Sequence, residues 1–219
     1  MLVQDVMTVH PVTIEPEMSV TDALRLMKEE NVRHLPVLKG GTELVGLITR
    51  DALNRATPSE LTSLSIWEIN YQLSRIRARD VMVKKVITVT EDVTVEDAAR
   101  KMIVEKVGSL PVMRDSALVG IVTDIDLLQA LADLMGSRQP GVRVTVQVPD
   151  ERGWMAKVSG AIADARGMII GGGSYPGTVP LKANIVFKVR GVPADQLEAV
   201  LRGIEGVAIL DIRESPETH

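Results

Sequence analysis

The sequence contains no cysteine and very few aromatic residues. Without cysteine, disulfides, thiolate zinc sites and cysteine nucleophiles are excluded. Aromatic residues make up only 2% of the chain, so its cores must be aliphatic, and a stacking platform for single-stranded nucleic acid is not expected. The net charge of −4 gives no basic footprint for a phosphate backbone, so the sequence predicts no nucleic-acid partner.

Long apolar runs are also missing. No stretch approaches the ~18 uninterrupted apolar residues of a membrane span. The segment Met1–Asp5 has neither the basic region nor the apolar run of a secretion signal. We therefore expect no membrane partner and a cytoplasmic location. With 45% hydrophobic residues in 219, the chain can still bury the cores of one large or two modest domains.

Signatures of catalysis and metal binding are absent from the sequence. The histidines, His10, His34 and His219, are scattered and have no metal-ligand spacing. The run Gly171–Ser174 lacks the lysine and the following helix of a phosphate loop, so we expect a strand end or bulge there. Nucleophile elbows and Gly-x-Gly-x-x-Gly fingerprints do not occur. The sequence predicts no catalytic residue, no metal, no required cofactor and no enzyme activity.

The most informative feature that is present is an internal repeat. Three early segments recur at a spacing of 75 residues, and two later ones recur after the loss of one residue. The pairs are Asp5-Val6-Met7 with Asp80-Val81-Met82, Thr13 with Thr88, Leu35-Pro36-Val37 with Leu110-Pro111-Val112, Leu44-Val45-Gly46 with Leu118-Val119-Gly120, and Thr49 with Thr123.

The repeated positions predict the same elements in each copy. Ser19 and Thr94 should each cap a helix whose apolar residues follow a helical period. Two apolar runs then predict neighbouring strands, at 35–38 and 44–48 in the first copy and at 110–113 and 118–122 in the second. Each copy is expected to be strand–helix–strand–strand–helix. Because so small a unit buries its apolar faces poorly alone, the two copies should pack together.

A linker separates the copies, and a different pattern follows them. A helix is predicted from Thr57 to Ile76, on which Trp67 and Tyr71 share a face that packs on the repeats or meets a partner. After a break in composition at 136–141, strands and helices are expected in the order β-α-β-β-α-β, the ferredoxin-like plan. The predicted divisions of the chain are 1–56, 57–78, 79–135 and 141–214.

These motifs carry a family resemblance. The tandem repeat resembles a pair of CBS domains, or Bateman module, through Asp-Val-Met, Leu-Pro-Val and Gly-hydrophobic-hydrophobic-Thr in both copies. The last segment resembles an ACT domain through its turn Val148–Gly153 and the later Gly167. The order of these segments, with Leu64–Tyr71 in the linker, is similar to acetoin-utilisation B-like proteins. The resemblance implies an α+β fold: a CBS pair, a helical linker and a ferredoxin-like ACT domain at the ranges above.

The resemblance also implies an adenosine ligand, AMP, ADP, ATP or S-adenosylmethionine, in a cleft between the copies. An aspartate three residues after the repeated threonine takes the ribose hydroxyls, and a carboxylate can accept both hydrogen bonds. Asp126 stands there after Thr123, whereas the first copy has Ala52 after Thr49 and Asp51 one residue early. We therefore expect one competent site.

The resemblance further implies a basic residue just before Leu-Pro-Val that faces the phosphates. The first copy offers Arg33-His34 and the second only Gly108-Ser109. Such a pair on a loop is alternatively a solvated surface feature, and His34 would make binding pH-sensitive. The candidate nucleotide-binding residues are Arg33, His34, Thr123 and Asp126, together with the repeated threonines Thr13, Thr88 and Thr49.

ACT domains bind amino acids or similar effectors between their first strand and first helix, commonly at a dimer interface. The resemblance therefore points to Asp150, Arg152, Gly153 and Gly167, and a helix N-terminus attracts carboxylates. Alternatively, Asp150 is only an N-cap and Gly153 only a backbone requirement.

The function implied is a non-catalytic, homodimeric sensor that relays ligand occupancy to an unidentified regulated protein. Three alternatives remain open at this point. One is a dimeric scaffold with empty CBS clefts, and another is an amino-acid sensor driven by the ACT domain. The third is a small hydrolase or transferase.

Overall fold

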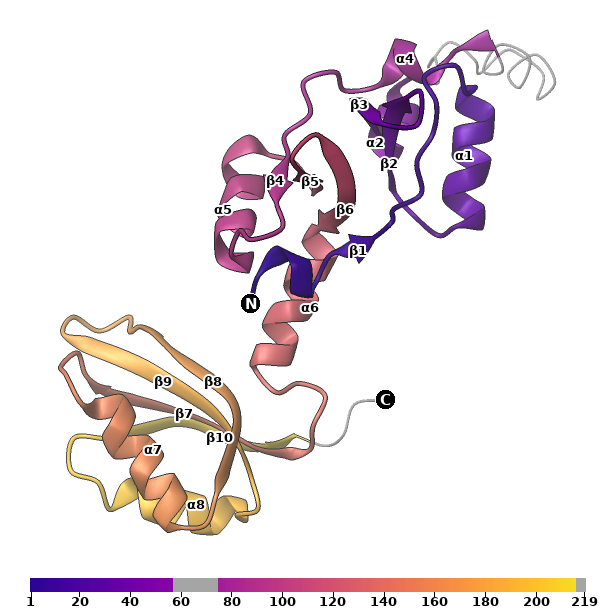
Figure 1. Ribbon diagram of the computed structural model, residues 1–219. Coiled ribbons are helices and arrows are strands. Elements are labelled where there is room, and N and C mark those ends of the chain that lie inside the picture. The colour runs from indigo at the N-terminus through magenta and orange to yellow at the C-terminus, as the bar shows by residue number, and fades with distance from the viewer. Residues whose placement is uncertain (57–74, 216–219) are drawn as a thin grey trace. The chain divides into compact units, whose positions relative to one another are not determined.

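The computed structural model describes residues 1–56 and 75–215 (Figure 1). Most of the expected linker helix, with Trp67 and Tyr71, lies outside the described residues, as does His219. The chain divides into two compact units, Met1–Leu127 and Leu128–His219, and each is described by itself. Among the residues described, no helix combines the length and the apolar character needed to span a membrane.

The first copy of the repeat follows the predicted order of elements. A 3-10 turn η1 (Val3–Asp5) and strand β1 (Thr8–Val9) precede helix α1 (Val20–Glu29), strands β2 (His34–Lys39) and β3 (Glu43–Thr49), and helix α2 (Arg50–Ala56). The Ser19 hydroxyl accepts a hydrogen bond from the Asp22 N–H at 3.1 Å, so Ser19 caps α1 as predicted.

The second copy repeats these elements. Helix α4 (Ala78–Val81) and strand β4 (Val89–Thr90) lead into α5 (Val95–Glu105), β5 (Ser109–Arg114), β6 (Ala117–Thr123) and α6 (Asp124–Leu134). Thr94 caps α5 by accepting from the Asp97 N–H at 3.2 Å. The hairpins β2–β3 and β5–β6 are both antiparallel, with a register shift at the same repeat position, after Val37 and after Val112.

The two copies pack together by exchanging their first segments. Val3 is fully buried in the core of the second copy, and Ala78 is fully buried in the core of the first. Strand β1 pairs with β6 of the other copy, and Val83 bridges to Leu47 in the same way. The exchange confirms that the copies pack against each other.

The same exchange explains the glycine of each Leu-Val-Gly motif. A Cβ added at Gly120 would lie 2.5 Å from the Met7 sulfur, and one added at Gly46 would overlap the Met82 sulfur in the same manner. The methionine of Asp-Val-Met in one copy thus covers the glycine of the other copy. The Asp-Val-Met and Leu-Val-Gly motifs are distant in sequence, and their contact in the fold gives a reason for both to occur in each copy.

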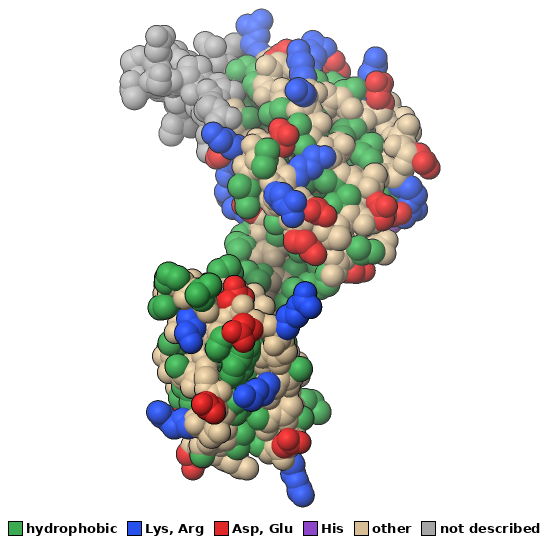
Figure 2. Space-filling view, turned by 90° about the vertical axis from the view of Figure 1, so that its left-hand side faces the viewer, with side chains coloured by type: hydrophobic (Ala, Val, Ile, Leu, Met, Phe, Trp, Pro, Cys, Tyr) green, Lys and Arg blue, Asp and Glu red, His purple; other side chains and the backbone are tan. Residues whose placement is uncertain are grey.

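The cores of the first unit are aliphatic, as the composition predicts. Both buried clusters consist of alanine, valine, leucine, isoleucine and methionine alone. On the face of this unit that Figure 2 shows, basic and acidic side chains are interspersed rather than gathered by sign.

The second unit confirms the predicted β-α-β-β-α-β order. Its elements are β7 (Gly141–Pro149), α7 (Trp154–Asp164), β8 (Met168–Pro176), β9 (Lys182–Arg190), α8 (Ala194–Arg202) and β10 (Ala208–Ser215). The strands form an antiparallel sheet in the order β10-β7-β9-β8. The two helices lie on one side of this sheet in Figure 1. Both helices contribute buried side chains to one core, namely Val158, Ile162, Leu197 and Leu201.

A strand bulge lies in β8 at Ile170, immediately before the glycine run for which the sequence predicts a strand end or bulge. The pairing of β8 with β9 shifts register between Ile169 and Gly171. A Cβ added at Gly171 would lie 2.5 Å from the Gly136 nitrogen and 2.7 Å from the Leu134 carbonyl oxygen. Glycine is required here because the backbone after α6 passes directly over the strand.

Replacing Gly171 with alanine should therefore destabilise the second unit by about 1–3 kcal/mol, because backbone atoms must move to admit the methyl group. Gly173 is the matched control, since a Cβ there has no atom within 4 Å. Gly173→Ala should change stability by no more than about 1 kcal/mol. Urea unfolding followed by circular dichroism compares the two variants, and equal midpoints would contradict the packing described.

Candidate functional site

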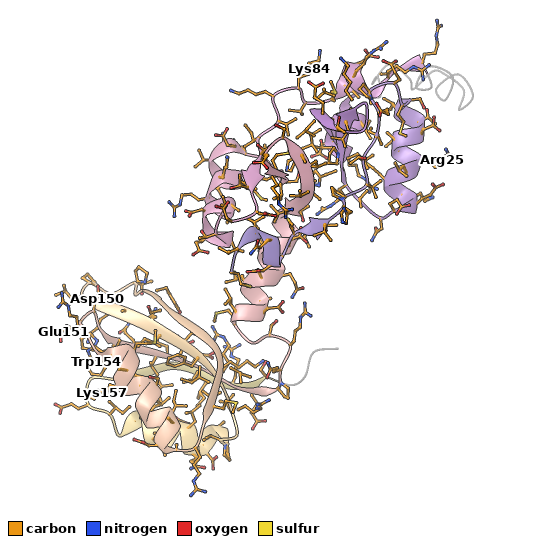
Figure 3. The ribbon with its side chains drawn as sticks, in the orientation of Figure 1. Arg25, Lys84, Asp150, Glu151, Trp154 and Lys157 are labelled. Atoms are coloured by element: carbon orange, nitrogen blue, oxygen red, sulfur yellow. The ribbon has the colours of Figure 1, made fainter. Side chains whose placement is uncertain are left out.

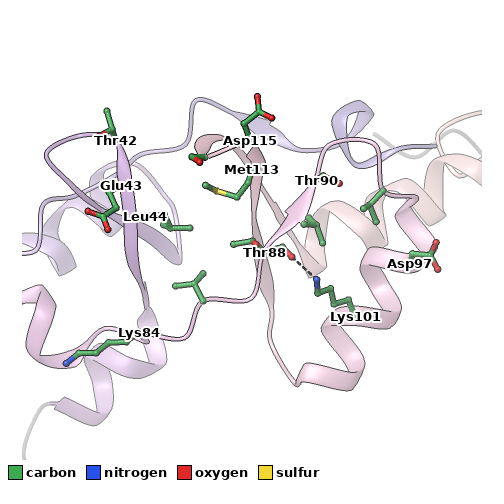
Figure 4. Close-up of a pocket in the computed structure, with 14 residues that line it drawn as sticks. Thr42, Glu43, Leu44, Lys84, Thr88, Thr90, Asp97, Lys101, Met113 and Asp115 are labelled. Atoms are coloured by element: carbon green, nitrogen blue, oxygen red, sulfur yellow. Dashed lines mark hydrogen bonds between the residues drawn. The ribbon is translucent and has the colours of Figure 1, made fainter.

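One cleft of the first unit, with a volume of about 910 Å³, was not predicted from the sequence (Figure 4). It lies between the β2–β3 turn and the β4–α5 region, over an apolar floor that includes Leu44 and Met113. The fold already uses two of its polar side chains. The Lys101 ammonium donates a hydrogen bond to the Thr88 carbonyl at 2.8 Å. The Asp97 carboxylate accepts a hydrogen bond from the Thr94 hydroxyl at the N-terminus of α5. Most of the predicted nucleotide-binding residues instead line two smaller clefts, and of that set only Thr88 lines this one.

The first of these, which we call the ribose cleft after the role expected of Asp126, has a volume of about 400 Å³ and brings four of the predicted residues together. Thr123 and Asp126 come from the second copy, at the start of α6. Arg33 and His34 come from the first copy, at the start of β2. The remaining lining residues are Thr8, His10, Pro11, Val12, Glu30, Asn31, Val32, Ile121 and Ile125.

Asp126 is held in the ribose cleft by Thr123. Its Oδ2 atom accepts hydrogen bonds from the Thr123 N–H at 2.7 Å and from the Thr123 hydroxyl at 2.8 Å. Within the described part of the chain, Oδ1 has no hydrogen-bond partner. The half-buried carboxylate is therefore fixed in direction while one oxygen stays available to a ligand.

The second cleft, which we call the basic cleft, is the counterpart of the first in the repeat. It has a volume of about 620 Å³. Thr49 stands here where the ribose cleft has Thr123, and the position of Asp126 is taken by the buried Ala52. The Thr49 hydroxyl accepts from the Ala52 N–H at 3.1 Å, so helix α2 is capped without a carboxylate. Asp51 lines this cleft instead.

Two lysines of the basic cleft escaped the sequence analysis. Lys85 and Lys106 line it, at the repeat positions that His10 and Asn31 occupy in the ribose cleft. Neither lysine belongs to a repeated motif, so a search for motifs does not find them. A residue-by-residue alignment of the two copies would have shown both.

Arg33 and His34 line both clefts, where the two copies meet. The Arg33 guanidinium lies 3.7 Å from the carboxylate of Asp124, at the start of α6. Burial lowers the pKa of His34 below its ordinary value, and Arg33 lowers it further, while Asp124 and Asp51 act in the opposite direction. His34 is therefore predominantly neutral at pH 7.

A pH dependence of stability follows from His34. Its folded pKa is lower than its unfolded value of about 6.5, so the unfolded chain takes up the proton more readily. The free energy of unfolding should therefore fall as the pH drops below about 6.5. Urea unfolding at several pH values between about 5.5 and 7.5 measures this slope. His34→Gln should flatten it, and an unchanged slope in that variant would exclude His34 as the cause.

The repeated threonines are distributed differently. Thr49 lines the basic cleft. Thr88 lines the large cleft of Figure 4, where its carbonyl group binds Lys101. Thr13 is exposed, and its neighbours Pro11 and Val12, rather than Thr13 itself, line the ribose cleft.

In the second unit, the predicted effector residues Asp150, Arg152 and Gly153 precede the start of α7, whereas Gly167 follows its end. Figure 3 shows Asp150 and Glu151 at the turn after β7, beside Trp154 and Lys157 on α7. The N-cap of α7 is Gly153, with a left-handed φ of 92°, and not Asp150. Gly167 is a packing residue, because a Cβ there would lie 2.8 Å from Ile162 and from Val189.

Comparison with known proteins assigns the repeat. A model of the CBS domain matches residues 3–58 and 78–133. The chain belongs to the CBS domain family. It is 33% identical to the uncharacterized protein MJ1426 of Methanocaldococcus jannaschii over 154 residues, which cover 60% of this chain and 91% of that protein.

Other relatives are longer enzymes that this chain matches over only part of their length. The chain is 32% identical to an inosine-5'-monophosphate dehydrogenase of Korarchaeum cryptofilum and 29% identical to a homoserine O-acetyltransferase of Methanohalobium evestigatum. The matches cover 62% and 60% of this chain. They span only 25% and 24% of those enzymes, about a quarter of their length.

Two solved structures share the CBS-pair fold. One is a Vibrio cholerae protein described as an acetoin utilization protein (AcuB), with 29% identity and a TM-score of 0.52 over 62% of this chain and 93% of that one. The other is the CBS domain pair of protein MJ0100 in complex with 5'-methylthioadenosine and S-adenosyl-L-methionine. It has 27% identity and a TM-score of 0.50, over 59% of this chain and 94% of that one.

Proposed function

We propose that the protein is a non-catalytic sensor that binds an adenosine-containing ligand in the ribose cleft and relays its occupancy to a regulated protein. The observation that carries this proposal is the ribose cleft itself. The Asp126 carboxylate from the second copy shares this cleft with Arg33 and His34 from the first. An anionic oxygen suits ribose hydroxyls, and a guanidinium suits phosphate oxygens.

The likeness to the MJ0100 pair supports the class of ligand. That pair was solved with two adenosine compounds, methylthioadenosine and S-adenosylmethionine. In this chain the basic cleft has Ala52 in place of the ribose carboxylate, so the proposal is one adenosine ligand per chain.

A ligand between the two copies can act as a switch. It contacts both copies at once, so it favours whichever arrangement of α6 and β2 fits it best. A partner that prefers the same arrangement would bind more tightly in its presence, as a coupling free energy between two sites. We also propose a homodimer, since two-fold dimers are the commonest assembly of soluble proteins.

For the second unit we propose an ACT domain, with an effector at the turn Asp150–Gly153. The support is the β-α-β-β-α-β order and the glycine-capped start of α7, whose backbone N–H groups favour a carboxylate. Asp150 and Arg152 belong to this turn, whereas Gly167 contributes through packing.

Thermal unfolding with a panel of ligands tests the proposal. AMP, ADP, ATP, S-adenosylmethionine, NAD and the common amino acids are added one at a time. A ligand at ~100 times its dissociation constant should stabilise the folded chain by roughly 2.7 kcal/mol. We expect a rise in melting temperature with adenosine compounds.

Other outcomes of the panel would favour the other functions. A rise with amino acids alone would move the sensing role to the second unit. No rise with any compound would contradict the sensor and favour a scaffold.

A further inference from the structure

We propose that the basic cleft holds the phosphate chain of the ligand whose adenosine occupies the ribose cleft. The preferred ligand is then an adenosine di- or triphosphate rather than AMP or S-adenosylmethionine. This inference rests on the proposed function and deepens it by naming the class of ligand.

The two clefts share one wall. Arg33 and His34 line both of them, and Asp124, 3.7 Å from Arg33, lines the basic cleft. A chain of phosphates that leaves a ribose held by Asp126 can therefore pass Arg33 into the basic cleft. The guanidinium can bind a phosphate at this crossing, since its fork of donors matches phosphate oxygens.

The charges of the two clefts are opposite in sign. The ribose cleft has one permanent cation, Arg33, against the carboxylates Glu30 and Asp126. The basic cleft has four cations against two carboxylates, and Arg33 already pairs with one of those carboxylates. The four cations are Arg33, Arg50, Lys85 and Lys106, and the two carboxylates are Asp51 and Asp124. A concave surface with this excess of positive charge attracts a polyanion.

Three differences between the copies favour a phosphate chain in the basic cleft, whereas Asp51, in place of Ile125, adds one carboxylate there. In the basic cleft, Ala52 takes the position of Asp126. A carboxylate at this position would bind ribose and repel phosphate. The basic cleft also has Lys85 at the position of His10 and Lys106 at the position of the uncharged Asn31. If the basic cleft were only a nucleoside site that had lost its function, the missing carboxylate alone would account for it. A phosphate site also explains the two additional lysines.

An unpartnered buried hydroxyl borders the same cleft. Ser109, the repeat counterpart of His34, is 2% exposed, and within the described residues its Oγ atom has no hydrogen-bond partner. A buried hydroxyl without a partner is unfavourable. Rotation about its Cα–Cβ bond would let Ser109 donate to a phosphate oxygen, so the loaded cleft would satisfy a group that is unsatisfied without ligand.

Calorimetric titration with ATP and with adenosine, in the wild-type chain and in Lys85→Ala/Lys106→Ala, tests the inference. We expect the wild type to bind ATP at least about tenfold more tightly than adenosine at low salt, with the difference shrinking as salt is added. The double variant should lose about tenfold in ATP affinity and keep its adenosine affinity within about twofold. Lys28→Ala/Lys84→Ala is the matched control, since it removes the same charge and neither lysine lines either small cleft.

Each result has one meaning. If no adenosine compound binds the wild type, the proposed function itself fails. If adenosine binds and ATP binds no better, or if both double variants lower ATP affinity equally, the function stands and the phosphate site is overturned. Inorganic tripolyphosphate provides the last arm. Competition between tripolyphosphate and ATP supports the shared ligand, whereas simultaneous binding of both would show a separate anion site and overturn it.

Discussion

Replacing Asp126 with alanine is expected to lower the affinity for adenosine compounds about 100-fold. The carboxylate can accept both ribose hydroxyls, and a hydrogen bond to a charged group contributes about 1.5–3 kcal/mol. Two such bonds account for at least a factor of about 100, since about 1.4 kcal/mol is a factor of ten. Isothermal titration calorimetry with ATP and adenosine measures the loss, which should be similar for both because the ribose is common to them.

The same substitution also affects the fold, and that effect can be separated. Asp126 bonds to Thr123 at the start of α6, so its removal should destabilise the chain by about 1 kcal/mol. Asp22→Ala is the matched control. Asp22 accepts from the Ser19 hydroxyl at 2.7 Å at the start of α1, and it lines neither small cleft. The control should lose similar stability and keep full affinity. Equal affinities in the two variants would show that Asp126 does not contribute to ligand binding.

Truncating the leucine of either Leu-Pro-Val motif should give the largest loss of stability, about 2–5 kcal/mol. Leu35 and Leu110 are fully buried in the cores of the two copies. Alanine at either position leaves a cavity that the surrounding strands cannot fill. Urea unfolding of Leu35→Ala and Leu110→Ala measures the loss.

Ile103→Ala provides the contrast in the same unit, because this side chain on α5 is 75% exposed. Its effect should be within about 0.5 kcal/mol. A loss below 1 kcal/mol for both leucine variants would show that the motif is not the core of each copy.

The elements of the fold were largely predictable, because local signals agree with the repeat. Ser19 and Thr94 cap helices as predicted, and the second unit has the predicted β-α-β-β-α-β order. The aliphatic cores and the bulge beside the glycine run also follow from composition and pattern. Such features depend on neighbours in sequence, or on a two- or 3.6-residue period, and one sequence displays them.

The contacts between the copies could not be read from the pattern. The repeat marks Met7 and Gly120 as important, yet only the fold shows the methionine of one copy over the glycine of the other. Gly153, rather than Asp150, caps α7 because its positive φ admits the turn. Lys85 and Lys106 were missed because they are where the copies differ, and the differences give the two clefts their opposite charge.

Titration of ATP into the wild-type chain, analysed for stoichiometry, tests most directly whether the unequal copies form a single adenosine site. One ATP per chain is expected, because only the second copy offers a carboxylate, Asp126, at the ribose position. Two equivalent ATP molecules per chain would show that Ala52 does not disable the first copy. That result would contradict both the single site and the assignment of the basic cleft to phosphates.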